Sequence, residues 1–257
     1  TITTTATTTA ITTTTTSPPP PSSSSSSSLA PLVFSLKSSL LDSLPSVEEL
    51  SKDPFMKQVG YGSELAVALK KLRGTTEAEQ AFLRASLEAQ LSHSDGIRGF
   101  MVAYLTGIDS DSDSANGIAD ETDPEILLET LHGLLASPSN SDDLVSLMCM
   151  NVVMPVAMIT MHQDPALSEA SRMTAARGGR LLASVFGASP SIRSNASAIR
   201  AAANGGSGDT NKDSDSDVDV DPKLVDYWTE FFGKWGYQDA QTKDIAATMN
   251  ELLESSS

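Results

Sequence analysis

Apolar residues recur every three or four positions along most of the chain after Pro31, which is the spacing of one face of an α-helix. Two helix starts are marked by capping boxes, Ser46 with Glu49 and Thr76 with Glu79. No stretch alternates apolar and polar residues as a half-buried strand does. The pattern therefore predicts an all-α fold, a multi-helix bundle of roughly eight to ten helices.

Aspartate followed by proline marks four further helix starts, because Asp caps free amides and Pro tolerates the first helical position. The four pairs are Asp53–Pro54, Asp123–Pro124, Asp164–Pro165 and Asp221–Pro222. Gly60 and Gly62 on either side of Tyr61 predict a turn, after which Ser63 would cap a further helix.

The stretch Leu144–Met161 is the centre of the predicted bundle. It contains eighteen uncharged residues, five of them methionine, which is close to the lower bound for a membrane span. Asn151 and Pro155 interrupt it, and no Lys/Arg cluster flanks it, so we favour a buried core helix over a span. Pro155 has no amide proton for the carbonyl of Asn151, which predicts a kink.

Met150, Met154, Met158 and Met161 fall at helical spacing on one side of this stretch. Methionine adapts to irregular gaps, so we favour a role in filling the core. The alternative is a flexible groove for a partner helix or an apolar ligand. The candidate residues for such an apolar pocket are Met150, Asn151, Met154, Pro155 and Met158.

Composition divides the chain into four segments. Residues 1–30 are a Thr/Ser/Pro-rich extension that predicts disorder, and residues 31–203 form the helical domain. Residues 204–221 predict an acidic flexible linker, and residues 222–254 an aromatic-rich helical hairpin. The Ser/Thr-rich, acid-poor start is half of an organelle-transit signature, whose arginines are missing. We expect an intracellular protein, with a plastid or another organelle as an alternative to the cytoplasm.

The formal net charge is −16, and it is concentrated in two segments. Residues 108–125 carry seven acids and no base, and residues 204–257 carry twelve acids against four lysines. Such a chain is a poor nucleic-acid binder and favours protein partners with basic surfaces. The acidic runs from Asp109 and Asp209 lack the Gly and Glu of a calcium loop, so we favour solvated loops.

The sequence predicts no catalytic residue, metal site or cofactor. The three histidines, His93, His132 and His162, do not pair at metal-ligand spacing. The single cysteine, Cys149, lies in an apolar setting that disfavours a reactive thiolate. One stretch, residues 166–203, is net positive. Its candidate anion-binding residues are Arg172, Arg177 and Arg180, although a solvated face is the simpler interpretation.

The C-terminal hairpin holds six of the thirteen aromatic residues of the chain within eleven positions. They are Tyr227, Trp228, Phe231, Phe232, Trp235 and Tyr237. One interpretation is that the hairpin docks on the main bundle through these rings. The other is a partner-binding module, since Trp and Tyr dominate binding hot spots.

Together these features favour a non-enzymatic helical protein that binds other proteins, as a subunit or assembly factor of an intracellular or organellar complex. A carrier of an apolar ligand or cofactor beside the central helix is the first alternative. An enzyme of unrecognised type, acting on an anionic substrate through the arginines, is the second. The sequence does not fix an oligomeric state.

Overall fold

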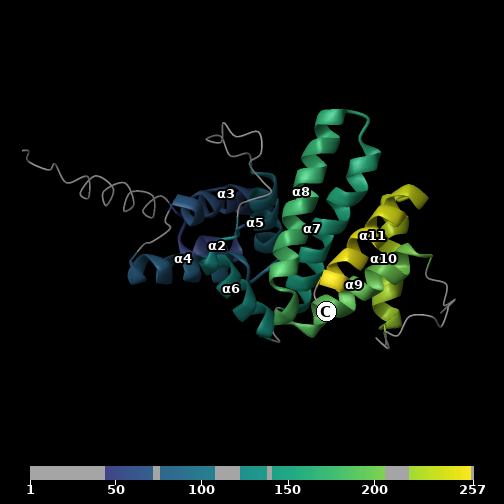
Figure 1. Ribbon diagram of the computed structural model, residues 1–257. Coiled ribbons are helices and arrows are strands. Elements are labelled where there is room, and N and C mark those ends of the chain that lie inside the picture. The colour runs from purple at the N-terminus through teal and green to yellow at the C-terminus, as the bar shows by residue number, and fades with distance from the viewer. Residues whose placement is uncertain (1–43, 72–75, 108–121, 138–140, 206–219, 256–257) are drawn as a thin grey trace, which may run out of the picture.

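The computed structural model describes residues 44–71, 76–107, 122–137, 141–205 and 220–255 (Figure 1). Within them the chain forms α-helices and one short 3-10 turn, and no strand, which confirms the all-α prediction. The helices are α2 (Val47–Lys52), α3 (Phe55–Lys71), α4 (Glu77–Gln90), α5 (Ser94–Thr106), α6 (Glu125–Ala136), α7 (Ser141–Met161), α8 (Pro165–Ser184), α9 (Pro190–Ala203), α10 (Pro222–Trp235) and α11 (Asp239–Ser255), with the turn η1 (Phe186–Ala188) between α8 and α9.

Three predicted segments lie outside the described residues. They are the N-terminal extension, most of the acidic run that begins at Asp109, and most of the linker over residues 204–221.

Helix α7 stands between two groups of helices. Figure 1 shows α2 to α6 on one side, α9 to α11 on the other, and the antiparallel pair α7 and α8 projecting beyond both. α7 contacts α5 and α6 of the first group, α9 and α11 of the second, and packs most extensively on α8. Its buried residues are Leu144, Val145, Met148, Cys149, Val152, Val153, Val156 and Ala157.

The predicted caps are confirmed at most of the helix starts. Ser46 and Thr76 form the two capping boxes, and Asp164 and Asp221 accept from the amides of Ala166 and Lys223. The prediction is wrong at Asp123, because Pro124 occupies the cap position and makes no side-chain cap. The Asp123 carboxylate instead accepts tertiary hydrogen bonds, described below.

The predicted turn at Gly60–Gly62 is also wrong, since α3 runs through both glycines. A glycine in a helix costs about 1 kcal/mol relative to alanine. At Gly62 close packing on α5 offsets this cost, because an added Cβ would lie 2.8 Å from the Phe100 Cα. The approach is mutual: a Cβ at Gly99 of α5 would lie 2.5 Å from the Gln58 Cβ of α3. The glycines therefore let two helix backbones touch rather than ending a helix.

This contact predicts opposite effects for two neighbouring alanine substitutions. Gly62→Ala should lower the free energy of unfolding by about 1–3 kcal/mol, because the new methyl group overlaps the α5 backbone. Gly60→Ala, on the same helix with nothing within 4 Å of its Cβ, should leave it unchanged or raise it by up to about 1 kcal/mol. Urea unfolding followed by circular dichroism measures both. Equal effects at the two sites would contradict the close packing of α3 on α5.

Candidate functional site

Two of the three candidate anion-binding arginines bond to other parts of the fold. Arg177 Nη1 donates to the carbonyls of Leu105, at 3.0 Å, and Gly107, at 2.8 Å, and so satisfies the C-terminal end of α5. Arg180 Nε lies 3.4 Å from Asp123 Oδ2. The Tyr104 hydroxyl donates to the other oxygen of this buried carboxylate at 2.6 Å. These bonds connect α8 to α5 and to the start of α6.

The third arginine, Arg172, pairs with Glu169 one turn earlier on the exposed side of α8. An exposed pair of this kind contributes little to stability. Arg177 and Arg180 have protein acceptors where an anionic ligand would otherwise sit. The anion-binding role stays a hypothesis, and a ligand would have to compete with these internal acceptors.

The C-terminal aromatics divide into buried and exposed rings. Trp228 is fully buried, and its indole N–H donates to Asn195 Oδ1 of α9 at 3.2 Å. Phe232 is also buried, and Phe231 and Tyr237 pack against the core, where burial raises the pKa of Tyr237 to about 12. These rings hold the hairpin on α9. Trp235, which is 48% exposed, and Tyr227, which is 42% exposed, are left at the surface.

Helix α7 is fully buried on one side only. Five of its large apolar residues that are not buried follow one another at helical spacing: Leu147, Met150, Met154 and Met158 are half-buried, and Met161 is 43% exposed. These five residues are called the methionine face below. Leu147 and Met150 pack against the core, whereas Met154, Met158 and Met161 are not among the side chains that do. The methionines predicted to fill the core thus lie mostly at its edge.

At the projecting end of the hairpin formed by α7 and α8, a large apolar side chain of α8 is also exposed. Ser168 Oγ donates to the Ile159 carbonyl at 2.7 Å, which fixes the start of α8 beside the end of α7. Leu167, the neighbour of Ser168, is 51% exposed. Figure 1 shows this end of α7 and α8 projecting from the bundle, with α11 reaching α7 at Thr160, whose Oγ1 accepts from Gln241 Nε2 at 2.8 Å. Leu167 could not be singled out from the sequence, because its place in the helical pattern does not show that α8 outruns its neighbours there.

Pro155 and Gly178 explain how α7 and α8 pack so closely. The Asn151 carbonyl has no amide partner at Pro155, and a Cβ at Gly178 of α8 would lie 2.9 Å from that oxygen. The Asn151 side chain donates to the Leu147 carbonyl at 2.7 Å. The polar groups at this point therefore face the α8 backbone and their own helix. None of the three main cavities among the described residues is lined by the five predicted pocket residues.

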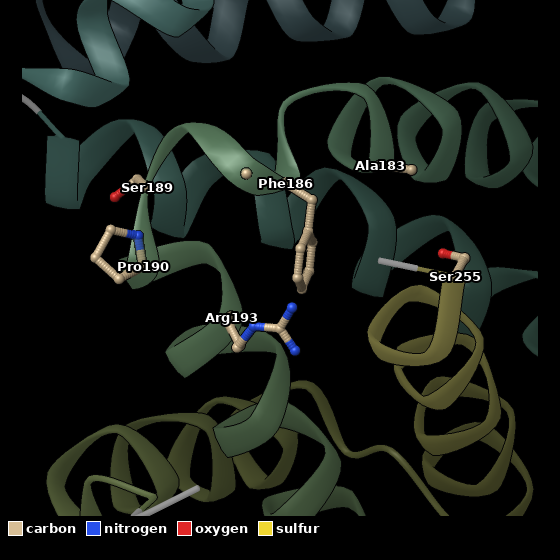
Figure 2. A pocket seen from close by; sticks show the side chains of 7 residues that line it. Ala183, Phe186, Ser189, Pro190, Arg193 and Ser255 are labelled. Atoms are coloured by element: carbon tan, nitrogen blue, oxygen red, sulfur yellow. The ribbon is translucent and has the colours of Figure 1, made fainter. Parts of the chain in front are cut away.

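One cavity, of about 510 Å³, opens where α8, η1, α9 and the end of α11 meet (Figure 2). The Arg193 guanidinium lies over the Phe186 ring, 5.0 Å from its centroid, and Ser255 faces them from α11. This stacking is a cation–π contact between two elements of the fold. The contact holds η1 against α9. It also engages Arg193, which is the only basic residue among those that line the cavity.

A second cavity, of about 560 Å³, lies where α7 and α10 begin. It is lined by Asp142, Asp143, Ser146, Ser191, Ser194, Asn195, Asp221, Leu224 and Tyr227. Three of these residues are acidic and none is basic. The Tyr227 hydroxyl lies 3.5 Å from Ser146 Oγ, which brings α10 beside α7 at this end. Helical spacing places Asp143, Leu147 and Met150 on one side of α7, so the acidic cavity adjoins the methionine face.

Candidate catalytic groups are buried or already bonded. Cys149 is fully buried, and burial raises the pKa of its thiol to about 12. His93 Nδ1 accepts from the Gly96 amide, so Nε2 carries the proton and donates to the Leu50 carbonyl at 2.9 Å. His93 thus caps α5 and fastens it to α2. Among the described residues, no three His, Cys, Asp or Glu side chains are placed to hold a metal ion.

By length and composition alone, α7 is the one helix of the described residues that could cross a membrane. Of its most apolar eighteen-residue stretch, 44% is buried against neighbouring helices. The buried part includes Val152 and Val153 at the middle of the helix. Burial of one side of the helix at its centre fits a bundle core better than an isolated span.

Comparison with known proteins gives one result. The family model described as "Uncharacterised conserved protein UCP020893" matches residues 62–252, which run from α3 to α11. No curated protein and no solved structure matches the chain.

The burial of Cys149 predicts an inert thiol. At pH 8 a pKa of about 12 leaves roughly one thiolate in ten thousand, and the surrounding helices exclude reagents. We expect Ellman's reagent to titrate no thiol in the folded protein within about an hour and one thiol per chain in about 6 M guanidinium. Rapid labelling of the folded protein would contradict this burial and would return Cys149 to the candidate nucleophiles.

Proposed function

The chain is a member of the uncharacterised conserved protein UCP020893 family, and we propose that it is a non-enzymatic helical protein that binds another protein through the methionine face. In this role it serves as a subunit or assembly factor of an intracellular or organellar complex. A carrier of an apolar ligand and an enzyme acting on an anionic substrate are the two competing hypotheses.

The observation that supports the proposal is the uncovered side of α7. Met154, Met158 and Met161 form an apolar strip along one face of α7, where the first two are half-buried and Met161 is 43% exposed, and Leu167 is exposed near the start of α8. Large side chains exposed singly are ordinary, whereas a contiguous apolar strip indicates an interaction site. Methionine suits such a site, because its flexible thioether adapts to differently shaped partners.

One exposed aromatic residue, Tyr227, lies beside the strip, and a second, Trp235, is exposed on the same helix, α10. Tyr227 lies next to Ser146 on the flank of α7, and Trp235 is two helical turns further along α10. Tyrosine and tryptophan provide large contact areas with few rotatable bonds. Of the six predicted partner-binding residues, we propose these two as the ones available to a partner, since Trp228 and Phe232 are buried and Phe231 and Tyr237 pack against the core.

We expect a double substitution in the strip to release the partner. Full burial of a methionine contributes about 1.5–3 kcal/mol. Met154 and Met158 are already half-buried, so Met154→Gln with Met158→Gln should cost about 2 kcal/mol of binding, or roughly 30-fold in Kd. Affinity purification of tagged full-length protein from its source cells, followed by native mass spectrometry, should show a complex of defined stoichiometry for the unchanged protein and not for the double variant.

The matched control is Met173→Gln, which changes a methionine that is 37% exposed on α8, outside the strip. It should retain the complex, and the thermal unfolding of all three proteins should coincide within about 3 °C, since none of the changed residues is in the dry core. A protein that is always recovered alone, or a complex that withstands the double substitution, would refute the proposal.

A further inference from the structure

We infer that the methionine face takes an amphipathic α-helix of the partner protein, and that basic residues at one end of this helix enter the acidic cavity formed by Asp142, Asp143 and Asp221. This inference rests on the proposed function and adds the chemistry of the partner.

The shape of the surface favours a helix as its occupant. The strip runs along α7 from Leu147 to Met161, and with Asp143 it extends over about 27 Å at the 1.5 Å rise of a helix. A partner helix of about five turns would cover that length. Its residues follow one another along a single face of α7, so the strip is longer than it is wide. Tyr227 on α10 lies beside its Leu147 end, at Ser146. An elongated apolar surface of this kind fits the binding of an amphipathic helix in a groove.

The charge of the surface indicates that the partner helix carries basic residues at one end. Asp142 and Asp143 are exposed, and no basic side chain of the described residues pairs with either of them. Asp221 lines the same cavity from α10, although one of its oxygens already accepts from the Lys223 amide. A Lys or Arg side chain of the partner would bring the missing positive charge on a flexible stem. Because the cavity adjoins only the Leu147 end of the strip, it also fixes the register of the partner.

Synthetic helices test this assignment directly. The probes are three fluorescein-labelled peptides of about 20 residues with the same Leu/Ala face, which differ at one end in carrying three arginines, three glutamines or three glutamates. Fluorescence anisotropy with the full-length protein at about 50 and about 300 mM NaCl gives Kd. We expect the arginine peptide to bind at least about tenfold more tightly than the glutamine peptide at low salt, with the advantage shrinking at high salt.

Paired variants separate the cavity from the net charge of the protein. Asp142→Asn with Asp143→Asn should remove the advantage of the arginine peptide. Asp226→Asn with Glu230→Gln removes the same charge from exposed positions of α10 outside the cavity and should preserve the advantage. Met154→Gln with Met158→Gln should weaken the arginine and glutamine peptides alike.

Each of the other outcomes would refute a specific part of this inference. Equal Kd values for the arginine and glutamine peptides would refute the inference that the partner helix is basic. The proposed function would still be tested independently by the purification of the complex from source cells. Equal effects of the two charge-removing variants would refute the cavity as the basic site. No binding of any peptide would refute the helical partner. Phosphatidylcholine/phosphatidylserine vesicles that bind the protein through Met154 and Met158 would assign the strip to lipid instead.

Discussion

The fold depends on an unequal covering of α7. One side of this helix is enclosed by α5 and α6 from the first half of the chain and by α8, α9 and α11 from the second. Removing that side from water supplies the main driving force for joining the two halves, because no other helix of the described residues contacts so many neighbours in both. The opposite side is left apolar and half-covered, which costs solubility unless something binds there. The stabilising core and the candidate site are therefore two faces of one helix.

The parts of the fold that local sequence determines were predictable. Ser46 with Glu49 and Thr76 with Glu79 specify a helix start through atoms only three residues apart, and both capping boxes are present. The periodic apolar pattern likewise requires no knowledge of the neighbours to predict an all-α chain. The caps at Asp164 and Asp221 were predictable for the same reason, since an N-cap bonds only to the first turn of its own helix.

The errors have a common cause, which is that long-range contacts changed the role of a local signal. Gly62 ends no helix because α5 packs on it, and Asp123 makes no cap because Tyr104 and Arg180 bind its carboxylate. The methionine face could not be predicted for a related reason. Helix α7 is apolar nearly all round, so its sequence does not show which side the neighbouring helices cover. The cavity beside Asp143 brings together α7, α9 and α10, which are far apart in sequence.

The burial of Trp228 determines how the last two helices belong to the molecule. Its indole is enclosed against α9 and bonded to Asn195, and α11 packs on both α7 and α9. The attachment of residues 220–255 therefore relies on packing rather than on the peptide chain that precedes them. A protease that cleaved between residues 206 and 219 would yield two fragments that migrate as one particle under native conditions and separate only in denaturant. A structural gene split at that position could likewise encode the protein as two associating polypeptides.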